Sequence, residues 1–317
     1  MEQITVPKAV FKQKSGLRLR MLKDLKQNKY VYLMVLPVVA YYLLFHYGPL
    51  YGIQIAFKNF SPSLGISDSP WAGLYHFEQF FNSIYFWRLI RNTVLLSAFD
   101  LLLSFPAPIL LALLMNEIRS RIFKRSVQTI TYLPHFVSIV VVVGMMVDFL
   151  SRDGLINSII GWFGLEQTAF LGEPGWFRSL YIFSGIWQNI GWGTIIYLAA
   201  ISSIDPTLYE AAKADGANRW KQAIHVTIPG IMPTIIILLI LQIGNLMTVG
   251  TEKILLMYNP FTYETADVIQ TYVYRKGLLE ADFSYSTAIG LFNSVINFTL
   301  LLLANSISRR LTETKLW

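Results

Sequence analysis

The chain has 317 residues, of which 54% are hydrophobic, and a formal net charge of +7. So large an apolar share excludes an ordinary soluble domain and indicates an integral membrane protein. Because the chain contains no cysteine, a disulfide framework and a thiolate metal site are also excluded.

Residues 1–29 form a basic segment ahead of the first long apolar run. They include eight Lys and Arg residues, among which Leu17, Met21, Leu22 and Leu25 recur at helical spacing. Two interpretations remain open, an amphipathic helix on the inner leaflet and a basic tail that only sets topology. A cleavable signal is not expected, because the apolar run that follows is too long and has no small-residue cleavage site.

Six apolar runs are long enough to cross a bilayer, whose hydrocarbon core of about 30 Å needs about 20 helical residues. They fall near residues 30–52, 92–114, 129–150, 179–200, 231–250 and 287–307. We therefore expect an all-α membrane protein with one transmembrane domain over residues 30–307 and a tail at 308–317. Pro106 and Pro108 predict a bend in the second span, and Pro134 predicts one in the third.

Lys and Arg residues are distributed unevenly around these spans. The two terminal segments and the loops 115–128 and 201–230 carry 18 of the 26, whereas the three other loops carry 8, together with ten acidic residues. By the positive-inside rule, both termini and these two loops are expected to be cytoplasmic. The basic excess then reports topology, and no nucleic-acid partner is expected.

Polar side chains inside the spans are candidate functional residues, because they are costly in lipid. Asp100 and Asp148 lie in the second and third spans, where no intramembrane Lys or Arg is expected to face them. The later spans carry neutral amides and tryptophans, namely Trp187, Gln188, Asn189, Trp192, Gln242, Asn245, Asn293 and Asn297. Spacings of three or four residues place the members of each pair, such as Gln188 and Trp192, on one helix face.

This combination of side chains is suited to a sugar, whose hydroxyls bind amides and whose C–H faces stack on rings. The set therefore predicts a substrate path for an uncharged or weakly charged glycan. The same amides can also hold neighbouring helices together, as they do in many membrane proteins. For each single residue the sequence leaves both interpretations open.

A polar segment at residues 204–233 lies between two of the apolar runs. Asp205, followed by proline, is a good helix start, and Gly216 stands where a left-handed residue would end that helix. Asn218 can then cap a second short helix. The segment therefore predicts two helices joined by a tight elbow.

This segment resembles the EAA loop of ABC importer permeases, which reads Glu-Ala-Ala, three residues, Gly, nine residues, then Ile-x-Leu-Pro. The matching residues are Glu210, Ala211, Ala212, Gly216 and Pro229, with Asp215 directly before the glycine and two conservative departures at 226–228. Further likeness to carbohydrate-uptake permeases covers nearly the whole chain, through residues 51–60, 70–81, 131–138 and 290–297. These segments are most similar to the sequences of the subgroup that imports complex oligosaccharides.

The resemblance implies a type I importer permease fold in the bacterial plasma membrane, with the EAA loop forming a coupling helix on the cytoplasmic face. It also implies four kinds of partner: a second permease subunit, expected to be a different chain; two ATPase subunits that bind Mg-ATP; an extracytoplasmic solute-binding protein; and the oligosaccharide itself. In this family the outer loops receive the binding protein, so Pro70–Leu74 and the loop 251–286 are candidate contacts.

The sequence contains none of the common motifs for nucleotide binding, zinc binding or nucleophilic catalysis. There is no G-x-x-x-x-G-K-[ST] phosphate loop, no H-E-x-x-H and no nucleophile elbow, so we expect neither an enzyme nor a cofactor or metal in this chain. Two alternatives remain. An ion-coupled secondary transporter would need internal repeats and ionisable midplane sites. A membrane glycan-processing enzyme would need paired carboxylates, for which Asp205 and Glu210 are the nearest pair.

Overall fold

The structure is a computed structural model that describes residue 24 and residues 26–312, with the side chains of 310–312 excepted. The basic N-terminal segment, residues 1–29, therefore lies almost entirely outside the described residues, and its two interpretations stay open. The chain divides into two compact units, Met1–Gln54 and Ile55–Trp317, each of which is described by itself. The described residues are helical, and their one β-type feature is an isolated bridge between Lys58 and Trp71.

The first unit is a single apolar helical segment. It consists of α2 (Lys29–Tyr42), a π turn (Leu43–Tyr47) and the start of a 3₁₀ stretch (Gly48–Phe57), and α2 and the π turn bury no residue. Just before α2, Asp24 accepts side-chain hydrogen bonds from Asn28 and Tyr32. A helix that is apolar on all sides requires lipid or a protein partner around it.

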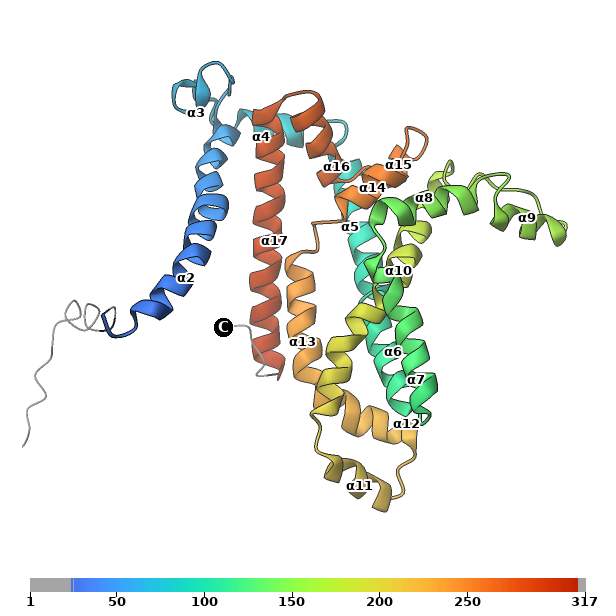
Figure 1. Ribbon diagram of the computed structural model, residues 1–317. Helices are drawn as coiled ribbons and strands as arrows, with labels where there is room; N and C mark the ends of the chain where they lie inside the picture. Colours follow the sequence, from blue (N-terminus) through green and yellow to red (C-terminus); the bar gives the residue numbers. More distant parts are fainter. Residues whose placement is uncertain (1–23, 25, 313–317) are drawn as a thin grey trace, which may run out of the picture. The chain divides into compact units, whose positions relative to one another are not determined.

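The second unit combines long helices with several short ones (Figure 1). The short helices of its first loop are α3 (Gly65–Asp68) and α4 (Tyr75–Phe81). There follow α5 (Phe86–Leu103), α6 (Pro106–Glu117), α7 (Arg121–Tyr132), α8 (Ile139–Leu150), α9 (Leu155–Trp162) and α10 (Pro174–Ser202). The chain continues with α11 (Pro206–Ala214), α12 (Arg219–Gln222), α13 (Ile228–Gly244), α14 (Thr251–Met257), α15 (Tyr263–Ala266), α16 (Ile269–Tyr274) and α17 (Phe283–Thr312).

Helix α10 is the centre of this unit and contacts α6, α7 and α13. Its glycines let the neighbouring backbones approach closely: a Cβ on Gly191 would lie 2.1 Å from the carbonyl oxygen of Thr131 in α7, and one on Gly193 would lie 2.9 Å from Pro108 in α6. Thr194 adds a hydrogen bond of 3.2 Å to the Pro108 carbonyl. Small residues at helix contacts are the usual way in which membrane helices pack.

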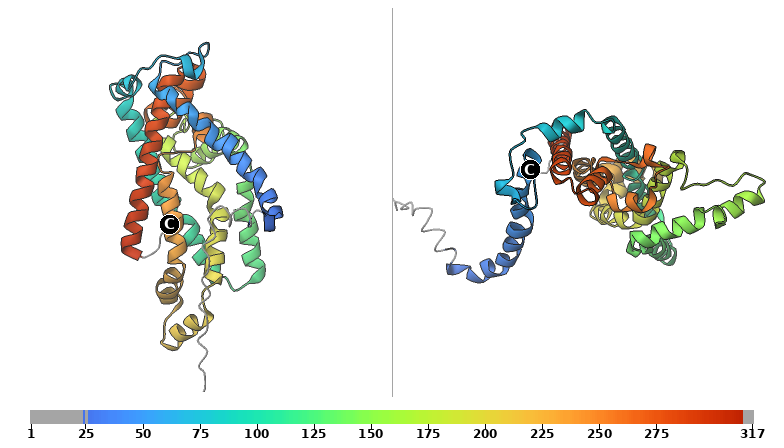
Figure 2. Two further views of the ribbon diagram at one scale, coloured as in Figure 1. Left: turned by 90° about the vertical axis from the view of Figure 1, so that its left-hand side faces the viewer. Right: turned by 90° about the horizontal axis from the view of Figure 1, so that it is seen from above.

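Helices α13 and α17 run side by side (Figures 1 and 2). A Cβ on Gly244 would lie 2.8 Å from the Leu301 side chain, so the two helices are also closely packed. At the end of α13, Asn297 of α17 accepts a hydrogen bond from the Met247 amide and donates one to Thr248 Oγ1, each of 2.9 Å. The amide of Asn297 therefore fastens one helix to the segment that follows the other.

Four helical segments among the described residues are long and apolar enough to cross a membrane, and they are Lys29–Phe57, Phe86–Glu117, Arg219–Gly244 and Phe283–Arg309. A fifth is formed if Arg121–Phe136 and Ile139–Trp162, which meet at 99°, are one broken span. The bend comes directly after the 3₁₀ turn that contains Pro134. Helix α10, which contains the predicted span 179–200, is not apolar enough to be counted with them.

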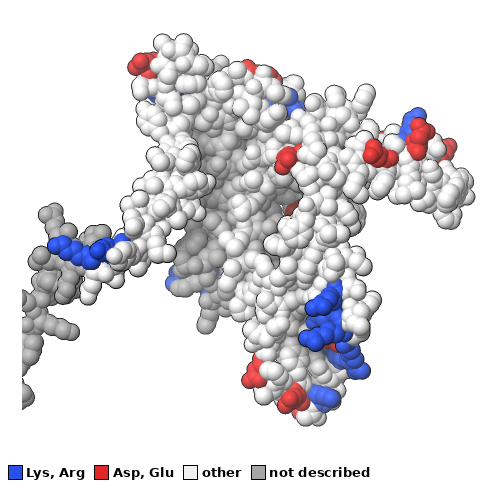
Figure 3. Space-filling model, in the orientation of Figure 1, with Lys and Arg blue, Asp and Glu red and all other residues white. Residues whose placement is uncertain are grey.

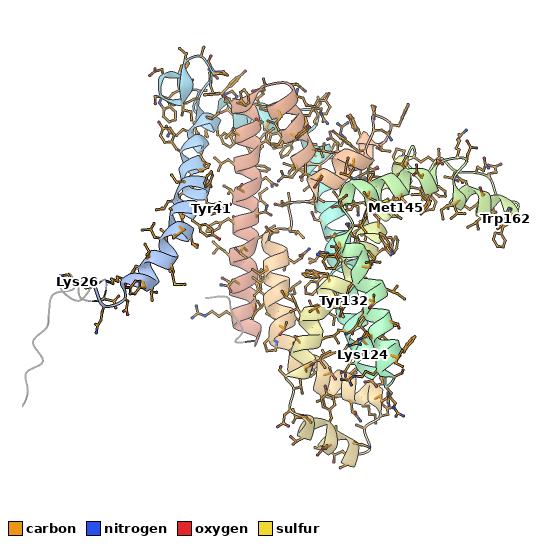
Figure 4. All side chains as sticks on the ribbon, in the orientation of Figure 1. Lys26, Tyr41, Lys124, Tyr132, Met145 and Trp162 are labelled. Atoms are coloured by element: carbon orange, nitrogen blue, oxygen red, sulfur yellow. The ribbon has the colours of Figure 1, made fainter. Side chains whose placement is uncertain are left out.

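The arm formed by α8 and α9 extends away from the rest of the second unit (Figures 2 and 4). Asn157 of α9 is fully buried. Its side-chain Nδ2 donates to the backbone carbonyl oxygens of Ser151 and Thr168, and its Oδ1 accepts from the Thr168 backbone amide. Trp162, at the end of α9, is 83% exposed. The arm is thus held together internally by one amide and presents an apolar tip.

Candidate functional site

Two neighbouring cavities lie between α5, α6, α10, α13 and α14 in the second unit. The charged cavity, of about 470 Å³, is lined by Asp100, Ser104, Ile139, Tyr181, Gly185, Gln188, Asn189, Gln242, Gly250, Thr251, Glu252 and Lys253. The aromatic cavity, of about 350 Å³, is lined by Ser104, Phe105, Pro108, Asn189, Trp192, Gly193, Ile196, Tyr197, Leu238, Leu241, Gln242 and Asn245. Because Ser104, Asn189 and Gln242 line both, the two cavities are direct neighbours.

The charged cavity contains two carboxylates and one ammonium. Asp100 of α5 accepts a 2.6 Å hydrogen bond from Ser104, which lies one turn further along the chain. Glu252 and Lys253 come from α14, a short helix of the loop between α13 and α17. The sequence did not predict a basic residue facing Asp100, but the loop folds back so that Lys253 lines the same cavity.

Lys253 is held against α10 by Tyr181. Its Nζ donates a 2.7 Å hydrogen bond to the Tyr181 carbonyl and lies 4.6 Å from the centre of the tyrosine ring. The Tyr181 hydroxyl in turn accepts a hydrogen bond of 3.1 Å from the Gly250 amide, just before α14. One tyrosine thus fixes both the start of α14 and its lysine.

Burial sets the protonation of this lysine. Only 7% of Lys253 is exposed, and this burial lowers the pKa of its ammonium to about 8, while the nearby Asp100 carboxylate partly opposes the decrease. A buried ammonium that titrates this close to neutral pH is unusual and marks a candidate functional group.

The aromatic cavity has a stacked pair at its wall. The rings of His135 and Trp192 stack at 4.5 Å with an interplanar angle of 6°, and His135 Nδ1 lies 3.0 Å from Asn189 Oδ1. Trp192 remains 48% exposed, so the ring presents a free surface to the cavity. Such a surface can stack on the apolar face of a sugar ring.

The predicted path residues fall into two groups. Gln188, Trp192, Gln242 and Asn245 line one or both cavities, although Gln188 also donates to the Val137 carbonyl at 2.9 Å. Trp187, Asn293 and Asn297 line neither cavity. Asn293 is 3% exposed with its Oδ1 unpartnered within the described part of the chain, and Asn297 makes the helix contact described above.

Sequence reasoning missed Ser104, Tyr181 and Lys253. A signal existed for Tyr181, which stands seven residues before Gln188 on α10 and so shares its face. None existed for Lys253, because nothing in a loop sequence indicates that α14 packs into the bundle.

The elbow, residues 205–229, is the second candidate site. Asp205 caps α11, as predicted, by accepting a 2.9 Å hydrogen bond from the Thr207 amide, which holds the pKa of its carboxyl below the ordinary value. Asn218 likewise caps α12 by accepting from the Lys221 amide at 2.9 Å. The two helices predicted from the N-cap residues are therefore present in the structure.

The turn between these helices depends on Gly216. Its φ is +77°, and its amide and that of Ala217 donate to the carbonyls of Lys213 and Ala212 at 3.1 and 2.9 Å. This is the Schellman ending, which favours glycine at the left-handed position. Nothing lies within 4 Å of a Cβ built there, so any substitution acts through backbone strain alone.

The residues matched to the EAA motif lie at the surface of the elbow. Glu210, Ala211, Asp215, Gly216 and Pro229 are exposed, and Ala212 is half-buried. Beside them Leu208 and Trp220 are 52% and 73% exposed. An exposed surface that combines acidic, small and apolar side chains is suited to contact with another protein.

The elbow is tied to the bundle at two points. Arg219 of α12 forms a 2.8 Å ion pair with Glu117 at the end of α6. The Tyr209 hydroxyl lies 3.0 Å from the Thr227 hydroxyl, which joins α11 to the start of the next long segment. These two contacts link the elbow to α6 and to the segment that leads into α13.

Metal binding has no support in the described residues, which contain no group of three or more His, Asp and Glu that could hold an ion. The remaining charged cluster surrounds Asp267, fully buried between Arg88 and Arg275. Asn92 of α5 donates to the carbonyl of Asp267 at 3.0 Å and accepts from Arg178 of α10 at 3.0 Å. This cluster is a fastening between the last loop and two long helices.

Apolar helices of spanning length around polar, partly charged cavities are typical of membrane transport proteins. The chain belongs to the family described as binding-protein-dependent transport system inner membrane component, which matches residues 104–313. It is therefore a transport permease subunit and not an enzyme.

Two relatives from Bacillus subtilis cover almost the whole chain. The polygalacturonan/rhamnogalacturonan transport system permease protein YteP is 48% identical over 97% of this chain and 96% of its own length. Protein LplB is 43% identical over 96% of each chain. The sequence resemblance to sugar permeases is thereby confirmed.

Solved structures give the same result for the fold. A chain of a bacterial ABC transporter involved in the import of the acidic polysaccharide alginate has a TM-score of 0.87 at 48% identity, covering 92% of this chain and 99% of its own. A chain from an alginate ABC transporter in complex with an alginate pentasaccharide-bound periplasmic protein has a TM-score of 0.88 at 47% identity, covering 94% and 100%. The fold is that of a type I importer permease.

Proposed function

We propose that this permease crosses the bacterial plasma membrane six times, with α10 as the fourth span. At 1.5 Å per residue, its 29 residues reach about 43 Å, enough to cross the bilayer. Its low apolar content follows from its place, because Gln188, Asn189 and Trp192 line the cavities instead of facing lipid. A polar helix is tolerated at the centre of a bundle that shields it.

The orientation follows from the charges. Lys and Arg gather over the lower end of the second unit in Figure 3, where α7 and the elbow lie, and this end is cytoplasmic by the positive-inside rule. Both termini then lie in the cytoplasm, and the loops before α5 and after α13 face outward toward a solute-binding protein.

The elbow is the coupling device. It places α11 against an ATPase subunit, and two such subunits bind Mg-ATP for the transporter, because this chain has no phosphate loop. The observation that carries this proposal is the exposed elbow with Glu210 at its surface and Arg219 paired with Glu117 of α6. A second, different permease subunit completes the path.

The substrate is an oligosaccharide delivered by the binding protein. Amides and a tryptophan face in the cavities supply hydrogen bonds and stacking for sugar rings, and the relative YteP is a permease of a polygalacturonan/rhamnogalacturonan transport system. Closure of the ATPase pair moves the elbow as a rigid body and opens the path outward. The substrate biases this equilibrium only through its difference in affinity for the two states.

The test is attachment of the ATPase to the purified complex. Glu210→Ala removes a carboxylate that pairs with a basic residue of the ATPase, a contact worth about 2 to 5 kcal/mol when its partner charge is left unpaired. Gly216→Asp strains the elbow by about 1 to 2 kcal/mol. Both variants are expected to insert normally but to lose ATPase or to hydrolyse ATP without transport.

The matched control is Glu166→Ala, which removes an exposed acid from the loop after α9. It is expected to retain the ATPase and to transport normally. Wild-type attachment and transport in both elbow variants would show that this loop is an ordinary hairpin.

A further inference from the structure

Lys253 is the only basic residue among the described residues that line the two cavities. It is 93% removed from solvent by packing, since 7% of it is exposed, and it forms no ion pair within 4.0 Å in the described part of the chain. Buried charges are normally paired, so an ammonium facing a cavity without a directly bound carboxylate is a candidate ligand group.

We propose that Lys253 binds the carboxylate of an acidic sugar, so that the charged cavity selects oligosaccharides built from uronic acids. This inference rests on the proposed function, because it assigns a specificity to the same substrate path.

The ammonium has donors left for such a ligand. Nζ carries three N–H groups, of which one donates to the Tyr181 carbonyl. Gly185 of α10 leaves room beside it: a Cβ built there would lie 3.3 Å from Nζ. The hydrogen bond to Tyr181 holds the ammonium in place, so little side-chain freedom is lost when a carboxylate binds.

Two acids share the cavity, and they set the class of ligand. Asp100, on α5, attracts Lys253 from beyond ion-pair distance, and Glu252 precedes Lys253 on α14. Carboxylates accept hydrogen bonds but donate none, so they can bind the hydroxyls of a sugar ring. A uronic acid carries one carboxylate and several hydroxyls on each ring, and this combination fits one ammonium beside two acids.

The relatives agree with this chemistry. The solved structures come from importers of alginate, an acidic polysaccharide, and YteP belongs to a polygalacturonan/rhamnogalacturonan transport system. An uncharged glycan would leave the buried ammonium without a carboxylate at ion-pair distance, attracted only by Asp100 from further away.

The experiment uses the complete transporter with its binding protein in vesicles at pH 7. Two probes are compared: trigalacturonate and the same trisaccharide with its carboxyl groups reduced to alcohols. Lys253→Gln is expected to raise the KM for trigalacturonate about tenfold while changing uptake of the reduced probe by less than about twofold. Lys253→Arg is expected to recover part of the loss, because it keeps the charge but places a larger head group at a buried position.

The matched control is Lys276→Gln, the same change at a lysine that pairs with Glu280 in the outer loop. It is expected to leave both probes unchanged. A wild-type transporter that imports both probes equally, or a Lys253→Gln variant that loses both to the same extent, overturns the assignment and leaves Lys253 a structural group. Either result leaves the oligosaccharide importer standing, whereas failure of ATP-driven uptake of every probe refutes the importer itself.

Discussion

The Asp267 carboxylate lies 2.7 Å from the guanidinium of Arg275, and the carboxylate is fully buried. It also pairs with Arg88 of α5 at 3.2 Å and accepts a hydrogen bond from Thr271 at 2.9 Å. Through these bonds the loop between α13 and α17 is fastened over α5. That fastening helps to position α14, and with it Lys253, at the charged cavity.

We predict that Asp267→Asn lowers the free energy of unfolding by about 2 to 4 kcal/mol. Breaking a buried ion pair leaves two arginines without their counter-charge, and their partial exposure reduces the penalty somewhat. The measurement is thermal unfolding of the purified complex. Glu264→Gln, an exposed acid of the same loop, serves as control and should unfold as the wild type does. Equal melting temperatures for the two variants would show that the cluster does not hold the loop.

We predict that Gly191→Ala destabilises the packing of α10 on α7 by about 1 to 3 kcal/mol. The added methyl group would stand 2.1 Å from the Thr131 carbonyl, so the two backbones must separate. Gly175→Ala on the same helix has open space around its Cβ and is the matched control. Thermal unfolding distinguishes the two, and a Gly191→Ala variant as stable as Gly175→Ala would contradict this packing.

The protonation of Lys253 predicts a dependence of stability on pH. Its pKa is about 8 in the folded chain against an ordinary value of 10.5. Between these values the unfolded state binds more protons than the folded state, so stability gains about 3 kcal/mol as pH rises through this window. Lys253→Met removes this titration. The difference in melting temperature between wild type and variant should therefore change in favour of the wild type from pH 8 to 10.5, and a constant difference would contradict the depressed pKa.

Sequence reasoning succeeded where structure is set locally. The caps at Asp205 and Asn218 and the left-handed Gly216 follow from helix-end rules that involve only near neighbours in the chain. The shared face of Gln188 and Trp192 followed from helical spacing in the same way.

The sequence was less informative about features that depend on contacts between residues far apart in the chain. Pro134 alone does not predict the 99° turn before α8, because many prolines bend a helix by a smaller angle. Asn293 and Asn297 are amides of the kind predicted to bind a sugar, but they line neither cavity. Lys253 reaches its cavity only because α14 folds back into the bundle, and no local pattern predicts such a contact.

The most direct test of the account is ATP-dependent sugar uptake by the reconstituted transporter. The complex of this permease with its partner permease and ATPase subunits is placed in vesicles, with the loaded binding protein outside and Mg-ATP inside. We predict that labelled oligosaccharide accumulates only when both ATP and the binding protein are present, and that Glu210→Ala abolishes the accumulation. Uptake that proceeds without ATP and follows an imposed ion gradient would contradict it.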